Sequence, residues 1–166
     1  MILAIDPGNE ESAYCIIKKD TYKPIAFGKV NNNELLNAIN NNLYSFDVDT
    51  LVIEKVASYG MAVGQTVFDT CIWTGRFVQG YLDNSVINRQ NVEYIYRKEE
   101  KINLCHSMKA KDSNIRQALI DRFAQFDFKN GKGNKKQQDW FYGFSKDVWA
   151  AFAVGCTYLD KQKEEL

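Results

Sequence analysis

Three carboxylates stand beside stretches of this sequence that are otherwise apolar. Asp6 follows an apolar run over residues 2–5, Glu54 follows another over residues 50–53, and Asp147 opens the last helical pattern. A carboxylate at the edge of a core is costly unless it is paired, and two close carboxylates repel until a divalent cation neutralises them. We therefore predict that Asp6 and Glu54 hold Mg2+ or Mn2+, which prefer oxygen ligands, with Asp147 as a third ligand.

Each acid also has an ordinary structural interpretation. Asp6 begins an Asp-Pro-Gly sequence and could simply form a turn. Glu54 could be a charge at a strand end with its carboxylate in water. Asp147 could be a helix N-cap or a first-turn acid, a role worth about 0.5 to 2 kcal/mol of helix stability. The metal-site hypothesis is favoured because all three acids share the same setting.

Apolar periodicity predicts five strands and four helices. The strands are expected over residues 2–5, 12–17, 24–30, 50–53 and 92–96. The helices are expected from a cap within residues 31–34 to about residue 43, and over residues 64–81, 113–123 and 146–159. The first three strands predict an antiparallel meander, and the first is apolar on both faces, which predicts a central place. This order is typical of a single α/β domain, over residues 1–166, with one central sheet.

Several segments resemble the RuvC family of Holliday junction resolvases. The resemblance begins with residues 2–8, which contain Asp6, and continues with residues 51–56 and 147–154, which contain Glu54 and Asp147. Residues 59–65 and 110–123 resemble more specifically the phage-encoded branch of that family. The matching segments cover nearly the whole chain in the family's order.

The resemblance implies a ribonuclease H-like fold with a mixed five-stranded sheet flanked by helices. It implies a homodimeric crossover junction endodeoxyribonuclease that cuts four-way and other branched DNA and leaves 5′-phosphates. It carries Asp6, Glu54 and Asp147 over as catalytic ligands of two Mg2+ or Mn2+ ions. The expected location is the cytoplasm, which is that of the host cell for a phage-encoded enzyme.

The sequence departs from the family pattern at two positions. The family has a further acid one helical turn after the position of Asp147, where this chain has Ala150. Asp112 is our choice of replacement ligand, although it could equally cap the following helix, and three protein ligands with water could suffice. The other candidates are Asp121 and Asp139. The family also has an aromatic residue where this chain has Ala57, which puts sequence selectivity at the junction in question.

DNA contacts are expected at local basic clusters, because the 21 basic and 21 acidic side chains give no net charge. The expected contacts are Lys109, Lys111, Arg116, Lys132, Lys135 and Lys136, with Tyr59 as a stacking residue. The last three lysines lie in a glycine-rich segment, 129–136, that we expect to be a mobile loop. The alternative is a solvated surface. A third cluster at Arg97, Lys98 and Lys101 is offset by two glutamates and carries less weight.

Other features bound the class of protein. The four cysteines lack the close pairs of a zinc site and predict free thiols in a reducing cytoplasm. No signal peptide or membrane span is expected. The helix over residues 64–81 is apolar on more than one face, which favours a dimer partner or a central core helix. Two other functions remain open: an actin-like nucleotide-binding phosphotransferase, since such proteins share the acid-x-glycine turn, and a non-catalytic junction-binding module, suggested by Ala150.

Overall fold

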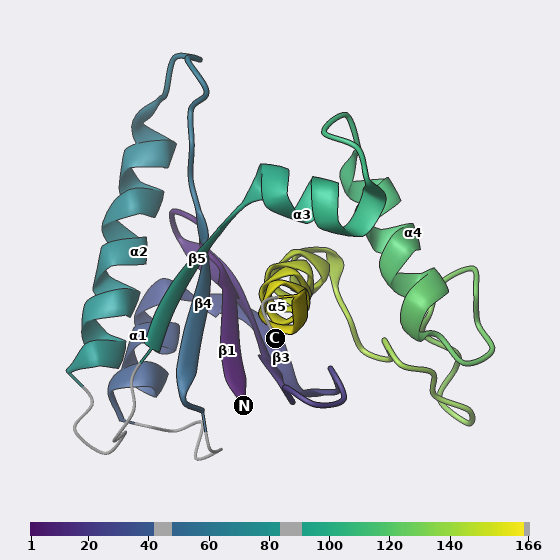
Figure 1. Cartoon of the computed structure of the whole chain (residues 1–166). Coiled ribbons are helices and arrows are strands. Elements are labelled where there is room, and N and C mark those ends of the chain that lie inside the picture. The colour runs from purple at the N-terminus through teal and green to yellow at the C-terminus, as the bar shows by residue number, and fades with distance from the viewer. Residues whose placement is uncertain (42–47, 84–90, 165–166) are drawn as a thin grey trace.

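The computed structural model describes residues 1–41, 48–83 and 91–164, and its centre is a mixed five-stranded sheet (Figure 1). The strands are β1 (Ile2–Asp6), β2 (Glu11–Ile17), β3 (Pro24–Asn31), β4 (Thr50–Lys55) and β5 (Asn91–Tyr96). Their order is β3-β2-β1-β4-β5, with β1 to β3 antiparallel and β1, β4 and β5 parallel. The predicted meander, the central first strand and the mixed five-stranded sheet are confirmed.

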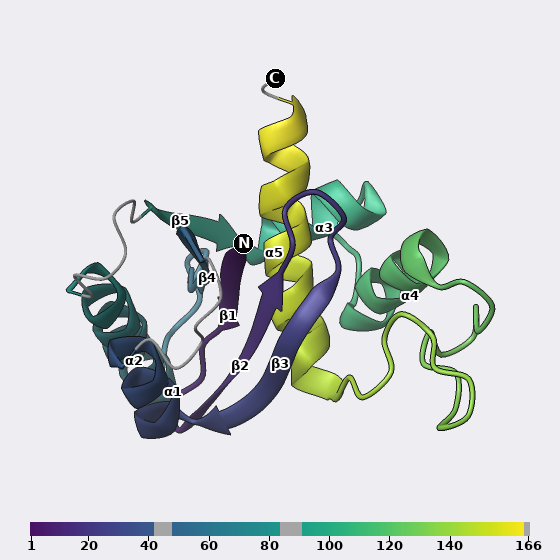
Figure 2. The same ribbon diagram turned by 90° about the horizontal axis from the view of Figure 1, so that it is seen from below.

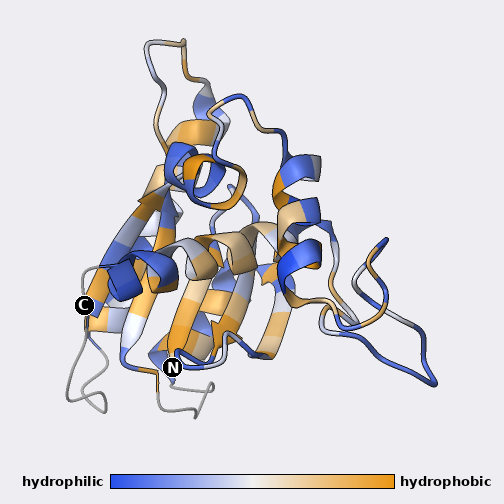
Figure 3. Ribbon diagram, turned by 45° about the vertical axis from the view of Figure 1, so that its right-hand side comes forward, coloured by the Kyte–Doolittle hydropathy of each residue, from blue (hydrophilic) through white to orange (hydrophobic). Residues whose placement is uncertain are grey.

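Helices cover both faces of the sheet (Figure 2). They are α1 (Asn32–Asn40), α2 (Gln65–Leu82), α3 (Arg97–Cys105), α4 (Asp112–Phe123) and α5 (Lys146–Glu164). α1 and α2 pack on one face, where Leu3 and Ile53 belong to the core. α5 packs on the other face, where Ala4 and Val52 belong to the second core, and α4 adds Leu119 there. Apolar residues accordingly concentrate on the strands (Figure 3).

α5 approaches the sheet closely at Gly155. A Cβ atom at Gly155 would lie 2.4 Å from Ile17 Cδ1 and 3.0 Å from Ala4 Cβ, so only glycine fits this contact without a shift. All residues from Val148 to Leu159 are buried except Ala150. α5 is therefore a core helix, and its contact with the sheet fixes where its first turn lies.

The prediction was wrong about α3, which the sequence pattern did not indicate as a helix. Only Glu100 of its nine residues is fully buried, so α3 lacks the apolar stripe on which periodicity depends. The predicted end of α1 near residue 43 lies outside the described residues. In the described part of the chain, no helix is long and apolar enough to cross a membrane.

The segment over residues 129–136 is a loop, as expected, and two carboxylates bind its backbone and the backbone next to it. The carboxylate of Asp139 accepts hydrogen bonds from the backbone N–H groups of Gln125, Phe126, Asp127 and Trp140. The Asp127 carboxylate in turn accepts bonds from the N–H groups of residues 130, 132 and 133. Composition did not indicate these two carboxylate anchors, because both lie outside the basic segment.

Candidate functional site

Asp6 and Glu54 lie side by side at the ends of two parallel neighbours, β1 and β4. Ile5 pairs with Ile53, so the next residue of each strand is an acid, and both acids point to the face that α5 covers. The two carboxyl groups share a hydrogen bond. Burial, and then the charge of Glu54, raise the pKa of Asp6 to about 8. Burial also raises the pKa of Glu54, so the pair retains a proton at neutral pH.

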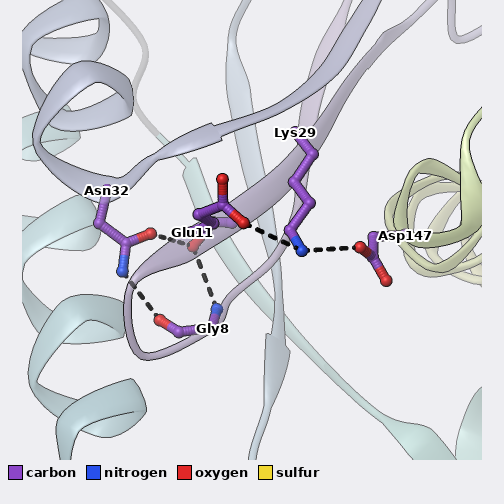
Figure 4. A network of polar contacts seen from close by, with 6 residues as sticks. Gly8, Glu11, Lys29, Asn32 and Asp147 are labelled. Atoms are coloured by element: carbon purple, nitrogen blue, oxygen red, sulfur yellow. Dashed lines mark hydrogen bonds and ion pairs between the residues drawn. The ribbon is translucent and has the colours of Figure 1, made fainter.

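The turn after Asp6 is held by polar side chains of β2 and α1 (Figure 4). The backbone N–H of Gly8 donates to Ser12 Oγ at 3.1 Å, and Asn32 Nδ2 donates to the Gly8 carbonyl at 2.9 Å. Ser12 Oγ donates to Asn32 Oδ1 at 2.6 Å, which closes the network. A Cβ atom at Gly8 would lie 2.2 Å from the Glu11 carbonyl oxygen, so the turn requires glycine there. The carboxylate at the end of β1 therefore has a rigid support.

Asp147 reaches the same area from the first turn of α5, where it is engaged by Lys29. The Lys29 ammonium lies 2.9 Å from Asp147 Oδ2 and 3.2 Å from Glu11 Oε2 (Figure 4). Asp6, Ala13 and Lys29 form one row across β1, β2 and β3. Asp147 is close enough to Asp6 for its charge to raise the pKa of Asp6 further. The structure thus brings all three predicted acids to one place.

A pocket of about 520 Å3 opens over these acids. It is lined by Asp6, Glu54, Arg97, Asp112, Ser113, Ile115, Arg116, Lys146, Asp147, Trp149 and Ala150. The lining contains four carboxylates and three cations, a mixture that suits a phosphate group bound beside a metal ion. Ala150 lies within this lining and therefore next to the site.

Arg97 is the pocket residue that the sequence analysis underrated. Its Nη1 lies 2.6 Å from Glu100 Oε2, and its Nη2 lies 2.5 Å from Asp112 Oδ1. The charge of Arg97 lowers the pKa of Glu54 against the larger effect of burial. An Arg and a Glu three residues apart, directly after a strand, is the signal that could have indicated this pair.

Glu100 anchors Arg97 from inside the protein. It is fully buried, and burial, followed by the charge of Glu54, raises its pKa well above the ordinary value. Its second oxygen, Oε1, has no hydrogen-bond partner among the described residues. A buried carboxylate of this kind costs stability unless its cation stays in place, so Glu100 restricts Arg97 to the pocket wall.

Asp112 lies in the pocket, whereas the other two candidates for a fourth acid have structural roles. The Asp112 side chain is 82% exposed and paired with Arg97. It is the first residue of α4, and the cap position is Lys111, so the N-cap interpretation was wrong by one residue. Asp121 accepts a hydrogen bond from Gln117 on the exposed side of α4, and Asp139 anchors the 129–136 segment.

The donor chemistry of the site fits a hard divalent cation at the Asp6–Glu54 pair. Two carboxylates that retain one proton between them are a place where a cation can replace that proton. Within the described residues, no group of three acidic, histidine or cysteine side chains is arranged to hold an ion as it stands. This agrees with the pairing of Asp147 with Lys29 and of Asp112 with Arg97.

The residues predicted to contact DNA fall into three places. Arg116 lies in the pocket, with its guanidinium 4.9 Å from the centre of the Trp149 ring. Lys109 and Lys111 are exposed just before α4, and Tyr59 is exposed in the segment after β4. The other three, Lys132, Lys135 and Lys136, lie on the 129–136 segment and outside the pocket lining.

Comparisons with known proteins find similar folds but no similar sequence. No protein-family model and no curated protein matches this sequence. A structure of Thermus thermophilus RuvC in complex with Holliday junction substrate matches with a TM-score of 0.71 at 10% identity, covering 99% of this chain and 95% of that one. Another Thermus thermophilus RuvC structure matches with a TM-score of 0.69 at 9% identity, covering 98% and 96%.

A third match supports the same fold. The yeast mitochondrial Holliday junction resolvase matches with a TM-score of 0.59 at 14% identity, covering 98% of this chain and 80% of that one. This chain has the fold of RuvC. The predicted ribonuclease H-like architecture is thereby confirmed. At such low identity the likeness concerns the fold, and a proposal for function must rest on the site.

Proposed function

We propose that this protein is a metal-dependent, structure-selective endodeoxyribonuclease that cuts four-way junctions and other branched DNA. The observation that carries the proposal is the proton-sharing Asp6–Glu54 pair, which faces Asp147 in a pocket that also contains Arg97, Arg116 and Lys146. The RuvC fold supports it, because one matching structure holds a Holliday junction. The phage-encoded branch, and thus a role in the cytoplasm of an infected cell, rests on the resemblance of residues 59–65 and 110–123.

In this proposal Asp6, Glu54 and Asp147 hold two Mg2+ or Mn2+ ions. When bound, such ions lower the pKa of the attacking water and stabilise the leaving oxygen, and cleavage leaves 5′-phosphates. On binding a cation, Asp6 and Glu54 would lose their shared proton, and Asp147 would leave its ion pair with Lys29 to become a ligand. Asp112 is the candidate for a fourth ligand, and Arg97 and Arg116 bind phosphate oxygens at the pocket wall.

The active form is proposed to be a homodimer of one nuclease domain, residues 1–166. α2 buries only Thr70, Phe77 and Tyr81, while Phe68 and Ile72 on its outer side are 53% and 61% exposed. An exposed apolar helix face of this kind is suited to a second copy of the same helix. Two sites in one dimer would cut two strands of a four-way junction symmetrically.

The test is cleavage of a labelled four-way junction at low salt, with Mg2+ and with Mn2+, and with a matched linear duplex as control. We expect metal-dependent cuts in the junction and none in the duplex. Asp6→Asn and Glu54→Gln should abolish cutting and leave junction binding intact. Folded wild-type protein that neither cuts nor prefers the junction would refute the proposal.

A non-catalytic junction-binding module is the second candidate. It is favoured by Ala150 in the pocket lining and by the engagement of Asp147 with Lys29. It predicts tight junction binding in the same assay with no cleavage under either metal. The two candidates therefore differ in one measured quantity, the cleavage rate of bound junction.

A further inference from the structure

Two lysines and three tyrosines form a second surface next to the candidate site. We call Lys55, Tyr59, Tyr94, Tyr96 and Lys98 the tyrosine–lysine patch. The Lys55 ammonium lies 5.2 Å from the centre of the Tyr94 ring and 5.7 Å from that of Tyr96. The Lys98 ammonium lies 5.8 Å from the Tyr59 ring and 5.7 Å from the Tyr96 ring. Tyr96 thus lies between the two cations.

The sheet places this patch opposite the carboxylates at the same strand ends. Lys55 pairs with Tyr96 across β4 and β5, directly after the pair formed by Glu54 and Ile95. Successive residues of a strand point to opposite faces. Glu54 therefore points to the α5 side, whereas Lys55 and Tyr96 point to the α2 side. The candidate site and the patch lie on opposite faces of the sheet, at the ends of the same strands.

Two of the three rings of the patch are exposed, and the third, Tyr96, is half-buried. Tyr59 is 58% exposed and Tyr94 is 41% exposed. Tyr59 has a φ of 47° in the segment after β4, a conformation that costs a non-glycine residue free energy. Tyr59 and Gly60 both have positive φ and are the central residues of a turn that the Met61 N–H closes by donating to the Ser58 carbonyl. This turn presents the Tyr59 ring to solvent.

Unpaired nucleotides match this surface in both shape and charge. A base can stack on the exposed rings of Tyr59 and Tyr94, and the two ammonium groups beside the rings can bind phosphates between bases. None of the five members is acidic, so the patch carries two positive charges. A duplex would hide its base faces, so the tyrosines favour DNA whose bases are unstacked.

We propose that the tyrosine–lysine patch binds unpaired nucleotides of the DNA strand that enters the Asp6–Glu54 site. The proposal rests on the proposed nuclease function and specifies which part of the substrate this chain grips. A strand that passes over the ends of β4 and β5 would place bases on Tyr94 and Tyr96 and the adjoining phosphate over Glu54. Recognition of branched DNA would then depend on the ease with which its bases unstack.

The test uses the full chain in metal-free buffer with a junction that carries 2-aminopurine at its branch point, and with oligothymidylate as a second ligand. Tyr94→Ala/Tyr96→Ala should weaken oligothymidylate binding by about tenfold or more, since each stacked base lost costs about that factor. It should also abolish the 2-aminopurine fluorescence change. Tyr94→Phe/Tyr96→Phe, which keeps both rings, should behave as wild type and serves as the folded control.

The lysines are tested by the salt dependence of binding. Lys55→Gln and Lys98→Gln should each lower the salt slope for oligothymidylate by roughly 0.7, the value for one phosphate contact in a single strand. Lys23→Gln, in the β2–β3 turn at the opposite end of the sheet, is the matched control and should leave the slope unchanged.

The outcomes separate this proposal from the proposed function. Wild-type affinity and fluorescence in the double alanine variant would overturn the patch proposal, while junction cleavage by the wild type would still support the nuclease. Patch-dependent binding of oligothymidylate without any junction cleavage would uphold the patch and contradict the nuclease. Equal loss of junction and linear duplex binding in the alanine variant would also overturn the patch proposal, because it would show no selectivity for unstacked bases.

Discussion

Asp6 and Asp139 are both largely covered aspartates, yet their surroundings shift their pKa values in opposite directions. Burial raises the pKa of Asp6 to about 8, and the neighbouring Glu54 adds to the rise. Burial acts in the same direction on Asp139, but four backbone N–H groups outweigh it and lower that pKa to about 2. The Asp139 carboxylate has its partners within the fold, whereas Asp6 shares a proton with another acid. Of these two aspartates, the one with the raised pKa lies in the candidate site, and the one with backbone N–H partners holds a loop of the scaffold.

The largest expected difference between the two aspartates is in catalysis. Asp6→Asn should lower junction cleavage by roughly a thousandfold or more, equivalent to about 4 kcal/mol of transition-state stabilisation. Asp139→Asn should leave cleavage per folded molecule within a few-fold of wild type, because Asp139 lies outside the pocket lining. Single-turnover cleavage rates check both, and comparable losses in the two variants would contradict the contrast.

Stability should show the reverse order. Asp139→Ala removes the acceptor of four backbone hydrogen bonds and should lower the free energy of unfolding by roughly 2 to 4 kcal/mol. Asp6→Asn replaces a carboxyl that resists ionisation and should not destabilise the protein. Urea unfolding in EDTA measures both values. A stable Asp139→Ala variant would show that the 129–136 segment does not depend on this anchor.

The pH dependence of stability without metal sharpens the comparison. The folded-state pKa of Asp6 lies above its unfolded value of 3.8, so its contribution is greatest at low pH and is lost as pH rises toward 8. The folded-state pKa of Asp139 lies below 3.8, so its contribution is present above that value and is lost as pH falls toward 2. The melting temperature of Asp6→Asn should therefore exceed that of the wild type by the largest margin at pH 8. Added Mg2+ should reduce this difference, because it stabilises the wild type. A gap that is independent of pH would contradict the shared proton.

Arg97 allows a smaller test of how the pocket is held. Arg97→Gln should lower cleavage by about 100-fold, which is the usual cost of losing one hydrogen-bond donor to a developing charge. It should also leave Glu100 buried without its cation. If three protein ligands suffice, Asp112→Asn removes only the exposed partner of Arg97 and should change the cleavage rate less than tenfold. Parallel rate measurements decide the role of Asp112, because a loss as large as that in Asp6→Asn would make it the fourth metal ligand.

The smallest effect is expected at the 129–136 segment. Lys135→Gln/Lys136→Gln should weaken junction binding a few-fold and reduce the salt slope by up to about 1.8, with the cleavage rate of bound junction unchanged. Titrations at several salt concentrations measure the slope. An unchanged slope would show that these exposed lysines remain in solvent when DNA is bound.

The parts of the fold that could be predicted were those in which the type of a residue directly indicates whether it is buried or exposed. Apolar runs located all five strands, and an acid directly after such a run located Asp6 and Glu54. α3 was missed because its one fully buried side chain is Glu100, which periodicity counts as solvent-facing, and its core contacts by apolar residues come only at its end, from Leu104 and Cys105. The pairing of Asp147 with Lys29 could not be predicted, since it depends on the register of three strands and on where α5 crosses them.

Gly155 gives this site a dependence on a distant contact. Two of the three candidate ligands stand on the sheet and the third stands on α5, eight residues before Gly155, or about 12 Å along the helix axis. A helix is stiff over that length, so the close packing of Gly155 on Ile17 and Ala4 fixes the distance between Asp147 and the two ligands on the sheet. A methyl group added at Gly155 would push the helix away from the sheet and change that distance. The geometry of the candidate metal site therefore depends on residues that contact neither substrate nor metal.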